Sequence, residues 1–194
     1  EFGFTRALYV VGGDQRLHFR QLKHVLERME LDWEPRVEHV DFGMMRLPEG
    51  KMSTRKGRVV FLDDVLDAAA AEAAKVIAEK NPELADQATI AETVGVGAVV
   101  FNDLKRERVK DIDFRLEEVL RFEGAPGPYV QYTHARLASI ERKAGSIDAA
   151  PDWSVLESAA GILGQMGRFP DVLRSAARNA EPSELTTFVL ALAR

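Results

Sequence analysis

The sequence predicts an α/β unit followed by an all-helical region. Over the first third of the chain, short β-branched and aromatic runs alternate with segments of helical periodicity. Beyond it the strand signals fade, and the remaining segments carry helical periodicity with caps or breakers between them. We therefore expect the strands, and any site that a sheet positions, in the amino-terminal part.

The first strand is predicted in RALYVVGGDQ. Leu8 to Val11 have the composition of a buried strand, and two glycines end the run. The next segment, QRLHFRQLKHVLERM, has apolar residues at helical spacing. Together they predict a strand, a glycine turn and a helix.

The unit continues with a second strand in RVEHVDFG. The segment RVVFL is predicted to be a third short strand or an extended segment. LDDVLDAAAAEAAKVIAEKN follows as a helix, with acidic residues in its first turn and strong helix formers throughout. We expect it to stop at Asn81 and Pro82.

Six helical patterns make up the rest of the chain. They are TIAETVGVGAVVFNDLKRER, RLEEVLRF, PYVQYTHARLASIERKAG, WSVLESAAGILGQM, PDVLRSAARN and SELTTFVLALAR. VGVGAVVF has two interpretations, because a short apolar run with two glycines also fits a buried strand; we predict a helix. GSIDAAPDW is the predicted linker.

Composition restricts the class of protein. Of 194 residues, 46% are hydrophobic, which is enough to form the core of one or two domains. The absence of cysteine excludes disulfides and thiolate metal sites. Since no apolar run is long enough to span a bilayer and the first residues lack signal-peptide features, we expect a cytoplasmic protein. The net charge of -5 means that a phosphate partner must meet a local basic patch.

Both ends of the sequence predict a piece of a larger protein. Glu1 is not an initiator Met, and the predicted first strand begins soon after it. TFVLALAR stops within a helical pattern that has no Gly or Asn cap.

The end of the first strand carries residues suited to a ligand. They are Gly12, Gly13, Asp14 and Gln15. In an α/β sheet, ligands bind at the carboxyl ends of the strands. The glycines let backbone approach a ligand, Asp14 could accept a hydrogen bond from a ribose hydroxyl, and His18 could face the same crevice. An ordinary turn has the same composition, so these residues alone do not decide between a ligand-binding turn and an ordinary turn.

The segment GKMSTRKG places three cations, Lys51, Arg55 and Lys56, and two hydroxyls, Ser53 and Thr54, between glycines. Its order is not that of a P-loop. A loop with several cations can close over a polyphosphate and stabilise charge that shifts during attack. One preorganised donor in a partly dried site lowers a barrier by roughly 3 to 4 kcal/mol, whereas the same charge in water contributes little. A solvated basic turn is the alternative.

KMSTRKG resembles the second signature of class I aminoacyl-tRNA synthetases, written KMSKS, in the form typical of arginyl-tRNA synthetase. YVVGGDQRLHFRQLKHVL, HVDFGMM and FEGAPGPYVQYTHARLASIERKA resemble three further blocks of that family, in the family's order, over residues 7 to 144. FPDVLRSAARNAEPSELTTFVLALA resembles the helices that follow. Several blocks in the right order are not expected by chance.

The resemblance implies a reaction and a fold. Arginyl-tRNA synthetases activate L-arginine with ATP to arginyl-adenylate and pyrophosphate, then transfer the arginyl group to the 3' end of tRNA(Arg). The implied fold is an α/β Rossmann-type half domain, the second half of the catalytic domain, at residues 1–110. Residues 111–194 would be an all-α region, a junction and the first helices of the anticodon-binding domain.

The same resemblance implies the cofactors and partners. Mg²⁺ is expected with ATP as the substrate complex, held mostly by phosphates and water, with no tightly bound cofactor and no protein metal cage. The implied partners are tRNA(Arg), ATP and L-arginine, without a membrane, and the full-length enzyme is expected to be a monomer.

Site residues also follow from the resemblance. Gln15 would contact arginine. The residues implied to border ATP are Gly12, Gly13, Asp14, His18, Phe42, Gly43, Met44 and Met52. The catalytic residues implied to attend the phosphates are Lys51, Ser53, Arg55 and Lys56. The segment from Phe42 to Met44 would lie along the adenine, where backbone amide and carbonyl groups read the base edge. No nucleophilic side chain is needed, because this chemistry depends on positioning and charge stabilisation.

Two departures from the family pattern bear on activity. Thr54 stands where the general signature has its second lysine, so Arg55, Lys56 or a cation elsewhere must substitute. The sequence also lacks the first signature, HIGH, and the Tyr and Asp that hold the guanidinium of arginine. We therefore expect that this chain does not charge tRNA by itself. A synthetase-like module that binds tRNA or a protein without catalysis is the alternative, and a generic nucleotide-binding domain ranks last.

Four residues are candidates for tRNA contact: Lys105, Arg106, Tyr132 and Arg136. The first two lie in the basic segment LKRERVK, for which a solvated surface is an equally good interpretation. Tyr129, Tyr132, His134 and Arg136 lie at the start of a predicted helix. An aromatic helix that anchors two domains is the interpretation we favour for the tyrosines.

Overall fold

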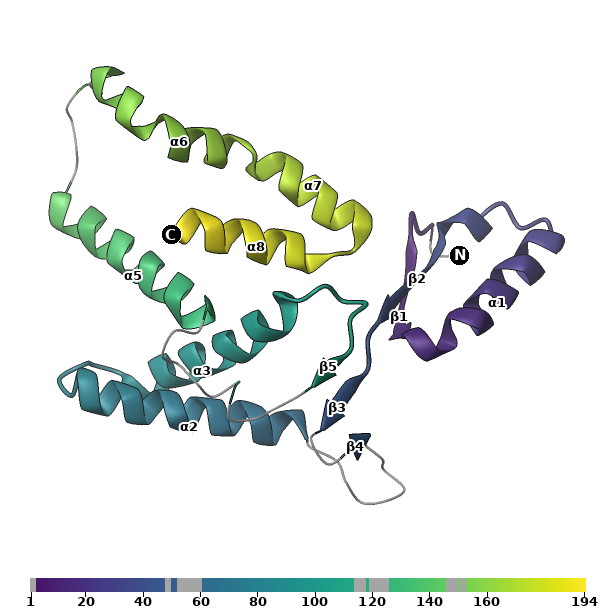
Figure 1. Ribbon diagram of the computed structural model, residues 1–194, viewed down its shortest axis with the longest axis horizontal. Coiled ribbons are helices and arrows are strands. Elements are labelled where there is room, and N and C mark those ends of the chain that lie inside the picture. Colours follow the sequence, from purple (N-terminus) through teal and green to yellow (C-terminus); the bar gives the residue numbers. More distant parts are fainter. Residues whose placement is uncertain are drawn as a thin grey trace. The chain divides into compact units, whose positions relative to one another are not determined.

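The computed structural model describes residues 3–47, 50–51, 61–113, 118, 126–145, 150 and 153–194. The chain divides into two units, each of which is described by itself. Unit 1 consists of Glu1–Arg58 with Glu107–Phe114, and unit 2 of Val59–Arg106 with Arg115–Arg194. Helices form most of the described chain, and its small sheets contain parallel strand pairs (Figure 1).

Unit 1 contains the predicted strand, turn, helix and strand. These are β1 (Ala7–Gly12), the 3-10 turn η1 (Gly13–Gln15), α1 (Arg16–Arg28), η2 (Glu34–Arg36) and β2 (Val37–Phe42). The strands are parallel, with Ala7 opposite Val37 at one end and Gly12 opposite Phe42 at the other. The two strands and the helix predicted here are confirmed.

Phe19 joins α1 to this strand pair. Its side chain is the buried one of α1, and its ring stacks on the imidazole of His39 in β2 with 4.1 Å between ring centroids. The ring of Tyr9 in β1 lies 5.5 Å from Phe19. His39 also places Nε2 2.9 Å from the carbonyl oxygen of Val11, so one histidine links both strands and the helix.

The predicted burial of β1 is wrong for this chain. Leu8 is 47% exposed, Tyr9 46% and Val10 66%. Parallel strands are usually covered on both faces, and the continuous apolar run from Leu8 to Val11 has the composition of such a strand. Among the described residues, however, β1 pairs with β2 alone, and the buried contact from α1 is made by one aromatic ring.

A second small sheet was not predicted. It joins β3 (Met45–Leu47) to β4 (Gly50–Lys51) in an antiparallel pair and to β5 (Ile112–Asp113) in a parallel one. These strands are too short to produce an alternation of apolar and polar residues that sequence reasoning can detect. Through β5, the segment 107–114 joins unit 1 although it follows a long stretch of unit 2.

The regular elements described in unit 2 are all helices, joined by turns and extended residues. Its helices are α2 (Leu62–Lys80), α3 (Gln87–Leu104), α5 (Pro126–Ala144), α6 (Leu156–Gly167), α7 (Phe169–Asn179) and α8 (Pro182–Ala193), with a 3-10 turn η4 (Trp153–Val155). The predicted helices over these ranges are confirmed, except that α3 ends at Leu104, before the KRER that the predicted helix included. VGVGAVVF lies inside α3, which decides between helix and strand in favour of the helix.

Small residues let α2 and α3 approach closely. Ala69 and Ala73 of α2 and Ala91, Gly95 and Ala98 of α3 are buried, and the two helices lie side by side (Figure 1). A Cβ on Gly95 would lie 2.5 Å from the backbone nitrogen of Ala70. This contact explains why a glycine occupies the middle of a helix, where it is otherwise unfavourable.

Hydrogen bonds and rings hold the later helices of unit 2 together. Thr186 of α8 donates through Oγ1 to the carbonyl of Leu104 at the end of α3. Tyr129 of α5 donates its hydroxyl proton to the carbonyl of Ala193, with 2.9 Å between the oxygens. The rings of Phe169 in α7 and Phe188 in α8 lie 5.7 Å apart.

Three sequence predictions fall largely outside the described residues. Of RVVFL, only Phe61 and Leu62 are described, and Phe61 is extended and precedes α2. RLEEVLRF lies outside the described residues except for Glu118, which is helical. Most of GSIDAAPDW also lies outside them. No helix within the described ranges is long and apolar enough to cross a membrane.

Candidate functional site

The predicted substrate segments of unit 1 meet at the carboxyl ends of β1 and β2. Gly12 and Phe42 are opposite each other in the parallel register. A Cβ on Gly12 would lie 3.5 Å from Sδ of Met44, and one on Gly13 would lie 3.4 Å from the carbonyl oxygen of Phe42. Residues 12–15 and 42–44, more than twenty positions apart in sequence, therefore form adjacent turns at the edge where α/β proteins bind ligands.

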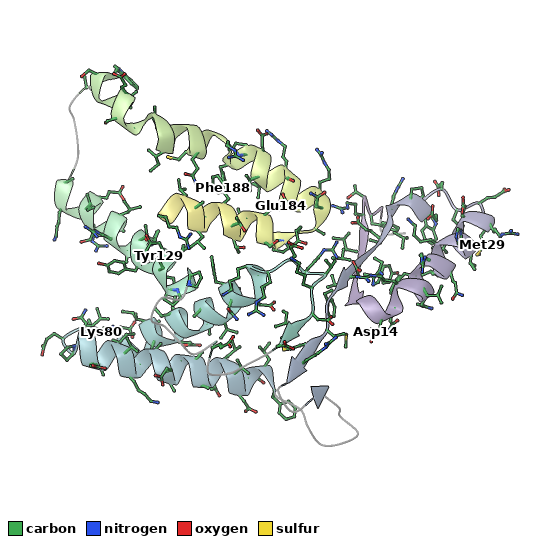
Figure 2. The ribbon with its side chains drawn as sticks, viewed as in Figure 1. Asp14, Met29, Lys80, Tyr129, Glu184 and Phe188 are labelled. Atoms are coloured by element: carbon green, nitrogen blue, oxygen red, sulfur yellow. The ribbon has the colours of Figure 1, made fainter. Side chains whose placement is uncertain are left out.

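The polar side chains of the first turn are open to solvent. Asp14, Gln15 and His18 are all exposed, and Asp14 lies beside the start of α1 (Figure 2). The imidazole of His18 contacts the ring of Phe19 edge-on, with 5.5 Å between centroids. The site therefore offers an amide, a carboxylate and an imidazole to a ligand without first breaking a packed core.

The backbone donors of the second turn are already used within the chain. The Gly43 N–H donates to the carbonyl of Arg108 at 2.7 Å, and the Met44 N–H donates to Oδ1 of Asp111 at 2.8 Å. The Met44 carbonyl accepts from the N–H of Ile112 at 2.9 Å. A base approaching this segment would therefore meet the exposed ring of Phe42 and not these two donors.

Gly43 is required by a neighbouring segment of the chain. A Cβ at this position would lie 2.1 Å from the carbonyl oxygen of Lys110 and 2.6 Å from the nitrogen of Asp111. Any side chain would therefore displace the backbone of residues 110–111. We call residues 108–112 the strap, because they pass directly over the turn that follows β2.

Asp41 forms two ion pairs at the carboxyl end of β2. Its carboxylate accepts from Nε of Arg16 and from Nη1 of Arg108, the latter at 2.7 Å. Nη1 of Arg108 also donates to the Asp41 carbonyl. Burial alone would raise the pKa of the Asp41 carboxyl, but the hydrogen bonds and charges of Arg108 and Arg16 outweigh burial and hold that pKa below its ordinary value.

Sequence reasoning missed four residues of this cluster. They are Arg16, Asp41, Arg108 and Asp111. Asp41 lies near the end of β2, two residues before Gly43, and a carboxylate followed by a glycine at a strand end is a detectable signal of a functional turn. Arg108 belongs to LKRERVK, which the sequence indicates as one basic patch. In the structure the Arg108 side chain pairs with Asp41, whereas Lys110 pairs with Glu107 at 3.0 Å.

The cationic loop lies mostly outside the described residues. Gly50 and Lys51 are described as strand β4, paired with β3, and nothing further is described until Phe61. Met52, Ser53, Thr54, Arg55 and Lys56 are therefore sequence-based assignments. In the part of the chain that is described, no group of three or more His, Asp or Glu side chains is arranged to hold a metal ion.

The tRNA-contact candidates lie in unit 2. Tyr132, 64% exposed, and Arg136 are one turn apart on α5, so both lie on one exposed face. Lys105 and Arg106 are half-buried at the end of α3. Burial lowers the pKa of the Lys105 ammonium, the charge of Arg106 lowers it further, and Glu118 only partly opposes them.

A family comparison covers the residues of this site. Residues 1–116 match the family described as tRNA synthetases class I (R), catalytic domain. The chain belongs to this family. The match includes β1, β2 and both turns of unit 1, and it also includes α2 and α3 of unit 2. Residues 130–194 match the DALR anticodon binding domain, which comprises most of α5 and the helices after it.

Curated relatives and solved structures agree with this family. The chain is 47% identical over 194 residues to the arginine–tRNA ligase of Pediococcus pentosaceus and 49% identical to that of Leuconostoc citreum. All of the chain is covered in both comparisons, but it spans only 34% of the length of each relative.

Two solved structures resemble the chain along 97% of its length. Thermus thermophilus arginyl-tRNA synthetase matches with a TM-score of 0.84 and 34% identity, over 32% of that chain. Plasmodium falciparum arginyl-tRNA synthetase matches with a TM-score of 0.76 and 20% identity, over 33% of that chain, and this match supports the fold alone.

Proposed function

We propose that this chain supplies the KMSKS-bearing half of the catalytic domain of an arginine–tRNA ligase, together with the first helices of its anticodon-binding domain. The observation that carries the proposal is the order of the two family matches, catalytic domain at 1–116 and anticodon domain at 130–194. In this proposal residues 1–110 are the Rossmann-type half domain and 111–194 the junction and helical region. The full enzyme joins L-arginine to tRNA(Arg) at the expense of ATP.

The two adjacent turns of unit 1 would form one wall of the activation site. Gln15 would bind arginine, and the ATP-binding set would be Gly12, Gly13, Asp14, His18, Phe42, Gly43, Met44 and Met52. Support comes from the parallel register, which brings residues 12–15 and 42–44 to the same edge. The exposed ring of Phe42 gives an adenine base an apolar surface there.

Lys51, Ser53, Arg55 and Lys56 would attend the phosphates of ATP. Their role is electrostatic, since attack by the arginine carboxylate creates charge on the phosphates and needs no nucleophile from the protein. Thr54 replaces a cation, so the catalytic charge falls to Arg55 and Lys56. Mg²⁺ would accompany ATP, bound mainly by phosphate oxygens and water.

Unit 2 would provide contacts to tRNA. Tyr132 and Arg136 are the stronger candidates, because their exposed positions one turn apart allow a ring to stack and a guanidinium to pair with phosphate. Lys105 and Arg106 are half-buried, and the lowered pKa of Lys105 reflects partial removal from water. We expect these two to contribute less.

The test is ATP–pyrophosphate exchange with L-arginine and tRNA, in the longer enzyme that carries this chain. Arg55→Gln and Lys56→Gln should each lower kcat by roughly a hundredfold, as loss of a preorganised donor does. Lys75→Gln is the matched control, since Lys75 is a 74% exposed cation on α2 that pairs only with its own helix neighbour Glu72 among the interactions described. It should change kcat less than about twofold.

The 194-residue chain alone should show no exchange, because it spans about a third of its relatives. Calorimetry on the chain with ATP and with tRNA separately would show which ligand it retains. An inactive longer enzyme would refute the proposal, and tRNA binding by that inactive enzyme would support a non-catalytic module.

A further inference from the structure

One carboxylate connects the two turns of the candidate site. Arg16 directly follows Gln15, and its guanidinium carbon lies 3.3 Å from the position of a Cβ on Gly13. The same guanidinium pairs with Asp41 through Nε. The first turn is therefore linked to the Asp41 carboxylate by the side chain of the residue that follows it.

Arg108 links the same carboxylate to the second turn. Its Nη1 lies 2.7 Å from Oδ1 of Asp41, and its carbonyl oxygen accepts the N–H of Gly43 at 2.7 Å. The side chain of Asp41 is 16% exposed and that of Arg108 is 24% exposed. The Asp41–Arg108 pair is shielded enough from water to be stronger than an ordinary surface ion pair. Arg16 is 56% exposed, so its ion pair with Asp41 is the weaker of the two.

The strap leaves the second turn little freedom. The peptide between Lys110 and Asp111 passes over Gly43 at a distance that excludes any side chain. Asp111 accepts from the Met44 N–H and pairs with Arg46. Movement of Arg108 would therefore move the strap, and movement of the strap would move the segment from Phe42 to Met44.

We propose that Asp41 is a positioning residue, which holds the turn of residues 13–15 and the turn of residues 42–44 in register through Arg16 and Arg108. The inference rests on the proposed function, in which the first turn binds arginine and the second lies along the nucleotide. Reacting groups must be held within about 0.5 Å of productive geometry, and a misplacement of about 1 Å costs roughly a hundredfold in rate. Asp41 acts on the substrates only through these two arginines.

Asp41→Asn tests the proposal in the longer enzyme, because it removes the charge while keeping the size of the side chain. Glu38→Gln is the matched control. Glu38 lies on the same strand and pairs with Arg6 at 2.5 Å, with both side chains 40% exposed. Glu38→Gln therefore removes one carboxylate of β2 whose ion pair, among the described residues, involves neither turn. Asp41→Glu restores the charge and should recover most of the loss.

Steady-state exchange kinetics separate positioning from folding. A variant that merely unfolds in part has less active enzyme, which lowers apparent kcat and leaves KM unchanged. Loss of positioning should instead raise KM for ATP and for L-arginine together, and lower kcat/KM by about tenfold in Asp41→Asn, against less than twofold in Glu38→Gln. Equal kinetics in these two variants would overturn the proposal.

Arg108 provides a second test of the same link. If Asp41→Asn does not fold, Arg108→Lys replaces it; a lysine keeps the charge but cannot bond both the carboxylate and the carbonyl of Asp41 in the geometry of a guanidinium. Arg108→Lys should raise both KM values at least threefold, and unchanged values would refute positioning. An inactive parent enzyme would instead count against the proposed function, since the variants are compared only with an active parent.

Discussion

Replacing Gly95 with alanine is expected to destabilise unit 2, although alanine is the better helix former. Gly95 lies in α3, where it packs against the backbone of Ala69 and Ala70 in α2. An added Cβ would lie 2.5 Å from the nitrogen of Ala70, 2.6 Å from the carbonyl carbon of Ala69 and 2.7 Å from the oxygen of Ala69. All three atoms belong to backbone inside a helix, so no side-chain rotation relieves the contact.

The magnitude follows from two opposing contributions. To move from 2.5 Å to an ordinary contact of 3.4 Å, the helices must separate locally by about 0.9 Å. Overpacking of this kind costs about 1–3 kcal/mol, whereas replacing glycine by alanine inside a helix gains up to about 1 kcal/mol. With the full gain subtracted, the net free energy of unfolding should fall by up to about 2 kcal/mol, equivalent to a Tm up to about 8 °C lower.

Thermal unfolding followed by circular dichroism measures this change, with Gly164→Ala as the matched control. Gly164 lies inside α6, and apart from nearby backbone of its own helix no atom of the described residues lies within 4 Å of an added Cβ. Alanine should therefore raise Tm there through helix propensity alone. The packing argument is refuted if Gly95→Ala raises Tm as Gly164→Ala does.

Three other predictions use the same folded chain. Ala180 ends α7 in the left-handed conformation, with φ of 49°. Ala180→Gly should therefore raise the free energy of unfolding by about 1 kcal/mol, measured by denaturant titration. No gain would mean that the left-handed cap is not strained. Tyr129→Phe loses the bond to the Ala193 carbonyl and should cost about 0.5–1.5 kcal/mol in the same titration; an unchanged midpoint would show that this bond contributes nothing. Because the pKa of Asp41 is depressed below its ordinary 3.8, its stabilisation is complete above that value and is lost as pH falls through the folded-state pKa. The Tm of the chain should therefore fall more steeply below about pH 4 than that of Asp41→Asn, and parallel curves would refute the linkage.

Long periodic segments of the fold were predictable from the sequence. The ends of α2 and the helical state of VGVGAVVF follow from helix formers, breakers and length, which act locally. The short strands β3, β4 and β5 were not predictable, because two or three residues carry no periodicity and pair with partners distant in sequence. Burial of β1 was predicted wrongly because composition indicates the environment that a strand favours. It does not show whether other elements of this chain cover that strand.

The two turns of the candidate site were predictable from the sequence, but the residues that hold them were not. Strand ends followed by GGDQ and FGMM indicate ligand-binding turns, and the parallel register brings them together. The partners of these turns were not predictable, since Arg108 and Asp111 come from a segment more than sixty residues further along the chain. A run such as LKRERVK shows its charge in the sequence, but only the structure separates the arginine that pairs with Asp41 from the lysine that pairs with Glu107.

The glycines of the two turns show why residue type alone does not assign a role. The sequence favours Gly12 and Gly13 as places where backbone approaches a ligand, and the family resemblance assigns Gly43 to the ATP site. At Gly12 that interpretation remains open, because an added Cβ would mainly meet the flexible side chains of Met44 and Phe42 at 3.5 Å or more. At Gly43 the chain's own strap occupies the space, 2.1 Å from where a Cβ would lie, so the strap requires a glycine whether or not a ligand binds. The requirement for glycine at position 43 is therefore evidence about the strap, and evidence for ligand approach must come from the first turn.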